Sequence, residues 1–262
     1  MSEASGRYID TGPVSTWYGE FGAGPPLVYL HPGLCDSRAL ADSVPWFSEH
    51  FRVLTPERRG HGRTADVDGP LSFDAMAQDT VAFIESVVGE PARVVGVSDG
   101  AMVAIVVAAL RPDLVDRVAC VSGPFHFTGW LPEAIDPANG APDGFAEMYG
   151  EVSPDGIGHF PVVVERMASA HLEGPTLTTT DLARIGARTL VMLGDDDEVV
   201  LEHALEFYRA LPHGELAVVP GTSHGLIVEK PDLCRRILVD FLTLDAPETY
   251  VPIRRRVGSA SS

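Results

Sequence analysis

Short apolar runs alternate with longer amphipathic stretches over most of the chain. Because these short runs carry few polar positions, they predict strands that are covered on both faces. The predicted strands are 27–30, 52–55, 93–97, 117–121, 188–193 and 215–220. Apolar residues recur at helical spacing in 73–88, 99–110, 201–211 and 231–243. Alternation of this kind predicts the α/β class.

The predicted architecture is a mostly parallel central sheet flanked by helices and wound by right-handed crossovers. Residues 7–24 predict an antiparallel hairpin at the edge of this sheet. After the sixth strand the alternation stops, and 125–186 mixes proline, glycine and aromatic residues. We expect one domain over residues 1–262, with a small lid at about 125–186 over the strand ends and a polar tail at 246–262.

Composition narrows the classes of partner. The chain has 262 residues, 45% of them hydrophobic, and a formal charge of −18. An acidic surface repels phosphate backbones and anionic lipids, so neither nucleic acid nor a membrane is expected as a partner. The longest apolar run, 101–110, is too short to span a bilayer, and the first residues lack the pattern of a signal peptide.

The cysteines and histidines are scattered. Cys35, Cys120 and Cys234 form no C-x-x-C pair, and the nine histidines show no H-x-H or H-E-x-x-H spacing. We therefore expect no disulfide framework, no metal and no cofactor, and a reducing cytoplasm as the location. His50, His203 and His213 are expected at the surface.

A strand-to-helix turn is the strongest chemical signal. The predicted strand 93–97 leads into Gly96-Val97-Ser98-Asp99-Gly100 and then into the predicted helix. Such a tight turn strains its central residue, and its glycines avoid collisions that any Cβ would cause. Ser98 would then be presented at the carboxyl end of the sheet as a nucleophile.

A serine nucleophile needs a base that is oriented by a carboxylate. Asp195, Asp196 and Asp197 follow the strand 188–193, and His224 follows the strand 215–220. The order Ser, Asp, His on this scaffold resembles the α/β-hydrolase superfamily. By resemblance to its G-x-x-D motif the acid is Asp197, with Asp195 and Asp196 as competitors, and the base is His224.

The resemblance also supplies an oxyanion site. His31-Pro32-Gly33-Leu34-Cys35 is similar to the family's loop after an early strand, which implies oxyanion donors at the backbone N–H groups of Leu34 and Asp99. Because Pro32 is inserted here, Cys35 competes with Leu34 for this role. Glu57 begins a segment, 57–64, that resembles the family's D-x-R-G-x-G-x-S motif, which shapes the loop beneath the site.

Asp99 has two interpretations. A Ser-Asp-Gly turn resembles the valacyclovir-hydrolase branch and enol-lactonase-like esterases, and in the former the aspartate grips a substrate amino group. Alternatively, an acidic residue simply complements the N-terminus of the helix that it begins.

The lid supplies aromatic surface that suits a small or medium acyl group or an aromatic ester. Each of its aromatic residues is also suited to packing the lid onto the sheet, and Cys35 equally suits a buried filler. The candidate substrate-binding residues are Asp99, Cys35, His126, Trp130, Tyr149 and His159.

The function expected from these features is a cofactor-independent serine hydrolase acting on a small-molecule carboxylic ester or lactone. The same three residues also serve carbon–carbon bond hydrolases, amidases and perhydrolases, and some proteins of this fold are ligand receptors. The oligomeric state is left open between monomer and homodimer.

Overall fold

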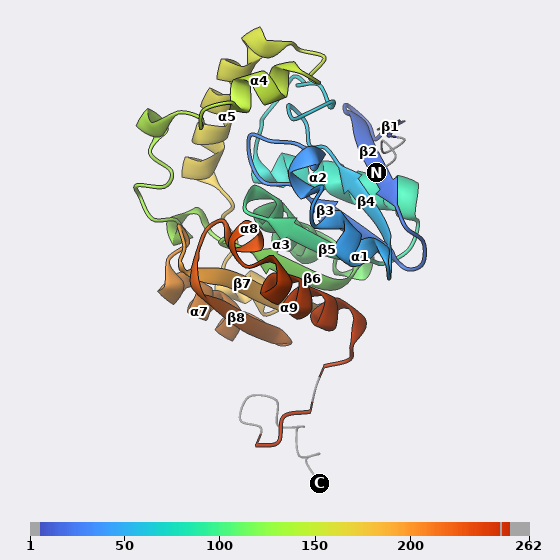
Figure 1. Ribbon diagram of the computed structural model, residues 1–262, viewed down its shortest axis with the longest axis vertical. Coiled ribbons are helices and arrows are strands. Elements are labelled where there is room, and N and C mark those ends of the chain that lie inside the picture. The colour runs from blue at the N-terminus through green and yellow to red at the C-terminus, as the bar shows by residue number, and fades with distance from the viewer. Residues whose placement is uncertain (1–5, 247, 252–262) are drawn as a thin grey trace.

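The computed structural model describes residues 6–246 and 248–251 (Figure 1). Within these residues eight strands form one sheet, in the order β1-β2-β4-β3-β5-β6-β7-β8. The strands are β1 (Arg7–Asp10), β2 (Ser15–Phe21), β3 (Pro26–Leu30), β4 (Arg52–Pro56), β5 (Ala92–Val97), β6 (Val115–Val121), β7 (Arg188–Asp196) and β8 (Gly214–Ser223).

The sheet is mostly parallel. Strand β1 pairs antiparallel with β2, and β2 with β4, whereas every pairing from β4 through β3 to β8 is parallel. The predicted edge hairpin and the α/β class are therefore confirmed. Strands β7 and β8 run further than predicted, because they continue to pair as far as Asp196 and Ser223.

Helices surround this sheet. Those within the described residues are α1 (Val44–Ser48), α2 (Phe73–Phe83), α3 (Asp99–Leu110), α4 (Phe145–Gly150), α5 (Phe160–Glu173), α6 (Thr179–Leu182), α7 (Leu201–Ala210), α8 (Leu226–Glu229) and α9 (Pro231–Thr243). The predicted helix 73–88 is α2 followed by a π-helical turn, Ile84–Val88. None of these helices is both long and apolar enough to cross a bilayer.

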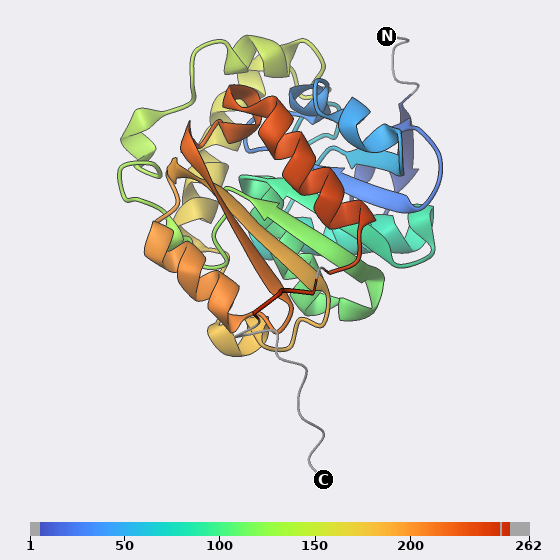
Figure 2. The same ribbon diagram turned by 60° about the horizontal axis from the view of Figure 1, so that its bottom comes forward.

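Each face of the sheet has its own core. Leu27 and Tyr29 of β3 pack with residues of α1 and α9, and Val28 and Leu30 pack on the opposite face with α2, α3 and α7. Figure 2 shows α9 lying across one face of the sheet with α1 beside it. Because both faces are covered, the strands need apolar residues at successive positions, which is the pattern in the sequence.

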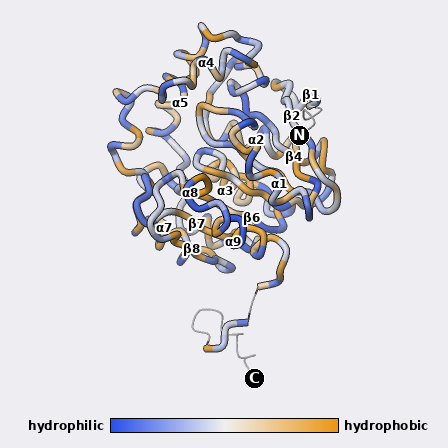
Figure 3. Tube along the Cα trace, viewed as in Figure 1, coloured by the Kyte–Doolittle hydropathy of each residue, from blue (hydrophilic) through white to orange (hydrophobic). Residues whose placement is uncertain are grey.

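Helix α3 is the most deeply buried of the helices. All its residues from Asp99 to Ala108 are buried, which explains why this stretch of sequence has no polar face. It lies in the middle of the molecule, between the sheet and α2 (Figures 1 and 3). The residue that precedes α3, Ser98, is consequently held by a rigid frame.

The segment between β6 and β7 contains α4, α5 and α6, and α4 and α5 stand at one end of the sheet (Figure 1). Ion pairs connect them to loops of the sheet. Asp66 pairs with His159 and Arg166, and Arg38 pairs with Glu151. Of the predicted tail, 246–262, only residues 246 and 248–251 are described, so Arg254, Arg255 and Arg256 lie outside the described residues.

Candidate active site

Ser98 occupies the turn between β5 and α3 in a strained conformation. Its φ and ψ are 54° and −120°, a region that side-chain-bearing residues rarely adopt. A Cβ on Gly96 would lie 2.1 Å from the carbonyl oxygen of Gly100, and one on Gly100 would lie 2.4 Å from that of Leu30. The two glycines therefore let strand, turn and helix approach closely enough to present the Ser98 hydroxyl.

A chain of hydrogen bonds joins three of the predicted site residues. The Ser98 hydroxyl lies 3.0 Å from Nε2 of His224, and Nδ1 of His224 lies 2.8 Å from Oδ1 of Asp197. An ionised carboxylate accepts a hydrogen bond from the Nδ1–H group, which leaves Nε2 as the acceptor for the serine hydroxyl. Asp197 follows β7 and His224 follows β8, so paired strand ends bring these side chains together.

Asp197 accepts hydrogen bonds at its carboxylate from other groups besides His224. Its side chain is 1% exposed, and Oδ2 accepts hydrogen bonds from the Ser122 hydroxyl at 2.6 Å and the Gly194 N–H at 3.0 Å. Burial raises the pKa of this carboxyl, but the bonds from His224, Ser122 and Gly194 outweigh burial and lower the pKa below its usual value. Asp197 is consequently an anion at neutral pH.

The two competing carboxylates lie elsewhere. Asp195 is exposed and accepts a hydrogen bond from the Thr222 N–H at 3.1 Å, and Asp196 is also exposed. Ser122 is a member of the site that the sequence did not single out. It follows β6 with a φ of 51°, and no motif in the sequence marks it.

The pKa of His224 is raised. Burial alone would lower it, but the hydrogen bond and charge of Asp197, followed by the charges of Glu198 and Asp99, outweigh burial. A raised pKa makes this imidazole a stronger base towards the Ser98 hydroxyl.

The loop after β3 lies against the turn. A Cβ on Gly33 would lie 2.1 Å from Oδ2 of Asp99, and Leu34 adopts a φ of 54°. Within the described part of the chain, the N–H groups of Leu34, Cys35 and Asp99 donate no hydrogen bond. These N–H groups are thus free for an oxyanion, and Leu34 and Cys35 stay alternatives for the donor from this loop.

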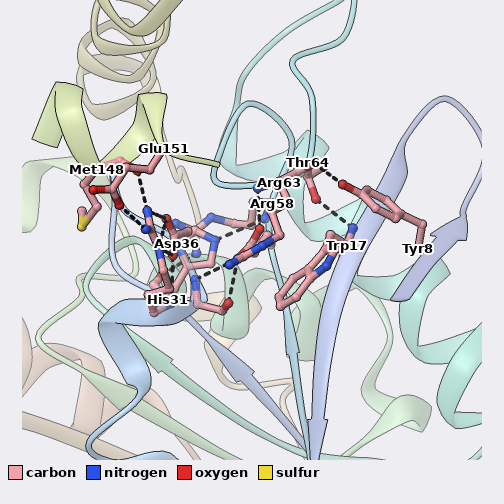
Figure 4. A network of polar contacts seen from close by, with 12 residues as sticks. Tyr8, Trp17, His31, Asp36, Arg58, Arg63, Thr64, Met148 and Glu151 are labelled. Carbon is pink, nitrogen blue, oxygen red and sulfur yellow. Dashed lines mark hydrogen bonds and ion pairs between the residues drawn. The ribbon is translucent and has the colours of Figure 1, made fainter. Parts of the chain in front are cut away.

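Arg58 shapes this loop from beneath. Its guanidinium donates to the carbonyl oxygens of His31 and Pro32, at 2.8 Å for Pro32, and these contacts are seen close by in Figure 4. The neighbouring Glu57 is fully buried and accepts hydrogen bonds from the Ser37 hydroxyl at 2.7 Å and the Arg63 guanidinium at 2.8 Å. The segment 57–64 therefore supports the conformation of the loop after β3.

Asp99 contacts a residue that the sequence did not single out. It is 2% exposed, and its Oδ1 lies 2.7 Å from Nε2 of His171 in α5. Burial raises the pKa of Asp99, but the charge and hydrogen bond of His171 and the charge of Arg58 outweigh burial and lower the pKa to about 2. His171 lies 72 positions away in an ordinary amphipathic helix, so no local pattern pointed to it.

The other candidate substrate-binding residues fall into two groups. The ring of Trp130 lies 5.7 Å from that of His224, so Trp130 borders the hydrogen-bonded chain. Cys35 is buried in the oxyanion loop, where its thiol lies 3.1 Å from the carbonyl oxygen of Gly33. Burial raises the pKa of this thiol to about 12.

The remaining three make contacts within the lid or between the lid and a sheet loop. His126 stacks on Phe127 with ring centroids 4.6 Å apart, and Tyr149 packs on Phe160 at 5.3 Å. His159 lies 2.9 Å from Asp66. Of these contacts, only that of His159 with Asp66 joins the segment between β6 and β7 to a loop of the sheet.

The surface prediction for His203 is wrong. His50 and His213 are exposed, but His203 is only 8% exposed and stacks on Phe125 with ring centroids 4.2 Å apart. It lies on the inner face of α7. The spacing of apolar residues in the sequence does not show whether a histidine in this helix is buried or exposed.

Comparison with known proteins gives the same family. Residues 24–237 match the alpha/beta hydrolase family. A non-heme haloperoxidase of Rhodococcus erythropolis is 28% identical over 86% of this chain and 95% of its own. A putative carbamate hydrolase, RutD, of Agrobacterium fabrum is 26% identical over 88% of this chain and 98% of its own.

Among solved structures, a meta-cleavage product hydrolase of Pseudomonas fluorescens superposes with a TM-score of 0.75 at 20% identity. The superposition covers 90% of this chain and 97% of that one. The eight-stranded sheet, the Ser98 turn and the family match over most of the length lead to one conclusion. This chain belongs to the alpha/beta hydrolase family.

Proposed function

We propose that the protein is a serine hydrolase that cleaves a small or medium carboxylic ester or lactone through an acyl-enzyme. The observation that carries this proposal is the continuous hydrogen-bonded chain from Ser98 through His224 to Asp197. The pKa of His224 is raised, Asp197 is a buried anion, and Ser98 has a strained backbone conformation. These are the conditions for nucleophilic acyl transfer.

In the first half-reaction, Ser98 Oγ attacks the substrate carbonyl carbon while Nε2 of His224 takes the hydroxyl proton. Asp197 holds the Nδ1 proton and stabilises the imidazolium that forms. The N–H groups of Leu34 and Asp99 stabilise the oxyanion, each contributing ~3 kcal/mol by analogy with similar donors. The imidazolium then protonates the leaving alkoxide, and the alcohol departs.

In the second half-reaction, water replaces the alcohol. His224 takes a proton from this water as its oxygen attacks the acyl carbon, and the same two N–H groups stabilise the second oxyanion. Collapse of this intermediate breaks the bond to Ser98, whose oxygen regains the proton from His224. The carboxylic acid leaves, and the enzyme returns to its starting state.

Fluorophosphonate labelling tests the nucleophile directly. The wild-type protein is expected to be labelled at Ser98, and Ser98→Ala is expected to show neither labelling nor turnover of nitrophenyl esters. Mass spectrometry of the labelled peptide identifies the modified residue. Turnover that survives in Ser98→Ala would overturn the proposal.

Sustained turnover distinguishes an enzyme from a receptor. A receptor that retains the three residues would release about one equivalent of nitrophenol and stop, whereas a hydrolase continues to release product. One relative is described as a putative carbamate hydrolase, so a matched nitrophenyl carbamate belongs in the series as the second candidate. A faster rate on the carbamate than on the ester would favour carbamate hydrolysis.

The same series tests the predicted cation site at Asp99. Because one oxygen of this carboxylate is already paired with His171, we expect an α-amino group to change kcat/KM by less than about threefold. A preference of tenfold or more for the amino ester would restore the first interpretation of Asp99.

A further inference from the structure

An imidazole from the lid covers the carboxylate beside the proposed nucleophile. Nε2 of His171 lies 2.7 Å from Oδ1 of Asp99, and the two side chains are 19% and 3% exposed. The His171 ring packs between Phe73, at 5.5 Å, and Trp130, at 6.1 Å. Trp130 in turn contacts His224. The pair is therefore part of the wall of the site.

Nε2 of His171 faces the Asp99 carboxylate. Burial and the charge of Arg58 lower the pKa of His171, but the charge and hydrogen bond of Asp99 outweigh them and raise it. The anionic carboxylate beside Nε2 therefore favours the protonated, positively charged form of the ring.

Asp99 creates an electrostatic conflict for acyl transfer. Its backbone N–H is a proposed oxyanion donor, whereas its side chain carries a buried negative charge on the same residue. Charges interact strongly where water is excluded, so an uncompensated carboxylate would oppose the oxyanion. The second oxygen, Oδ2, has no hydrogen-bond partner in the described part of the chain.

The charge around Asp99 becomes net positive only when His171 is protonated. Arg58 is a cation, since burial lowers its pKa only to about 10. His61 is neutral because burial lowers its pKa to about 4, and Cys35 is a neutral thiol. The cluster of Arg58, Asp99 and His171 thus carries one net positive charge with the imidazolium present and none without it.

We infer that His171 is a positioning residue for catalysis: the lid places its imidazolium on Asp99, so that the oxyanion forms beside a net positive charge. This inference rests on the proposed function. It assigns the lid an electrostatic task, because only a docked α5 delivers the compensating charge to the nucleophile turn. The contribution arises as charge develops on the substrate, so it acts on kcat more than on KM.

His171→Gln tests this role because glutamine can keep a hydrogen bond to Asp99 without the charge. We expect kcat on a nitrophenyl ester to fall about 10- to 100-fold with KM within about threefold. The acid limb of the pH profile should move to higher pH, since an uncompensated Asp99 raises the pKa of His224 further. The double variant Asp99→Asn/His171→Gln restores the net charge and should recover at least tenfold of the lost kcat.

His159→Gln is the matched control. It removes the other lid histidine that pairs with an aspartate, Asp66, and so measures the effect of loosening the lid. We expect it to leave the acid limb where it is in the wild type. An unchanged kcat in His171→Gln, a double variant no better than His171→Gln, or the same pH shift in His159→Gln would each overturn the inference.

The wild type and Asp99→Asn give a second test that does not need the His171 variants to fold. In the wild type, kcat should fall at alkaline pH as His171 loses its proton, and this limb should be absent from Asp99→Asn. An alkaline limb of equal position in both proteins would contradict the inference. Absence of Ser98 labelling and turnover in the wild type would instead be a failure of the proposed function.

Discussion

Two imidazole–carboxylate pairs flank the proposed nucleophile, and they differ in the structural elements that position them. The His224–Asp197 pair spans 2.8 Å between loops that follow neighbouring strands, so the sheet positions both members. The His171–Asp99 pair spans 2.7 Å between the turn at α3 and the lid helix α5. Both members of the first pair belong to the sheet framework, whereas one member of the second comes from α5, in the segment between β6 and β7.

The two histidines differ in what their ring nitrogens contact, and this difference separates their roles. His224 uses one nitrogen for Asp197 and keeps the other for the Ser98 hydroxyl, so it can transfer a proton. His171 directs its Nε2 to Asp99 and not to the Ser98 hydroxyl, so it can hold charge beside the turn but is not placed to take the serine proton. Similar geometry therefore supports proton transfer in one pair and charge compensation in the other.

Asp197→Asn is expected to break the first pair with the largest effect. An amide cannot hold the imidazole in the required tautomer, so kcat should fall about 10⁴-fold. Steady-state kinetics on a nitrophenyl ester measure the loss, and circular dichroism checks the fold.

Asp196→Asn is the matched control, since this neighbouring carboxylate is exposed. Its kcat should stay within about twofold of the wild type. A large loss in Asp196→Asn together with an active Asp197→Asn would show that the acid was assigned to the wrong position.

Ser122→Ala tests the first pair more finely, because it removes one hydrogen bond to Asp197 and leaves His224 in place. The serine hydroxyl donates a 2.6 Å hydrogen bond to Oδ2, and a bond to a charged group is worth ~1.5 to 3 kcal/mol. We expect kcat to fall about tenfold or somewhat more.

Ser43→Ala removes another buried serine hydroxyl, which pairs with Tyr29 at 2.9 Å away from the site. It should affect stability and leave kcat near the wild-type value. Equal kcat losses in both variants would mean that the Ser122 effect arises from general loosening rather than from Asp197.

The acid limb of kcat/KM is expected to follow His224. The base must be neutral in the free enzyme, and its pKa is raised in the folded protein, so activity should be lost as pH falls through a value above the ordinary ~6.5. In Asp197→Asn the residual activity should show this limb at lower pH, because the raising carboxylate is gone. Rate profiles from pH 5 to 9 measure both limbs, and a limb that does not move would remove Asp197 as the cause.

The same comparison explains what could be predicted from the sequence. The strands, the turn at Ser98 and the order of Asp197 and His224 carry local patterns, because a buried strand and a strained turn each restrict the residue types that fit. His171 and Ser122 carry no such pattern. They become part of the site only through contacts 72 and 75 positions away, which depend on how the chain packs.

His203 is a buried histidine without a carboxylate partner, as are His31 and His61, and it shows what burial does to a histidine when no carboxylate compensates it. Burial, with a smaller contribution from His126, lowers its pKa to about 4, and its Nε2 has no hydrogen-bond partner in the described residues. A depressed histidine pKa means that the unfolded chain takes up the proton first. Stability is therefore lost as pH falls from the ordinary value of ~6.5 towards 4, by about 2 kcal/mol between pH 7 and pH 5.

His203→Leu should remove this loss, because leucine does not titrate and suits the apolar site beside Phe125 and Gly129. Urea unfolding at pH 7 and pH 5 gives the change in the free energy of unfolding with pH for the wild type and for His203→Leu. The two proteins are compared by this change and not by their stability at either pH. His213→Leu, at an exposed position, is the matched control and should keep the wild-type dependence. If His203→Leu kept the full wild-type dependence, His203 would not contribute to the acid sensitivity, and its contrast with the two paired histidines would fail.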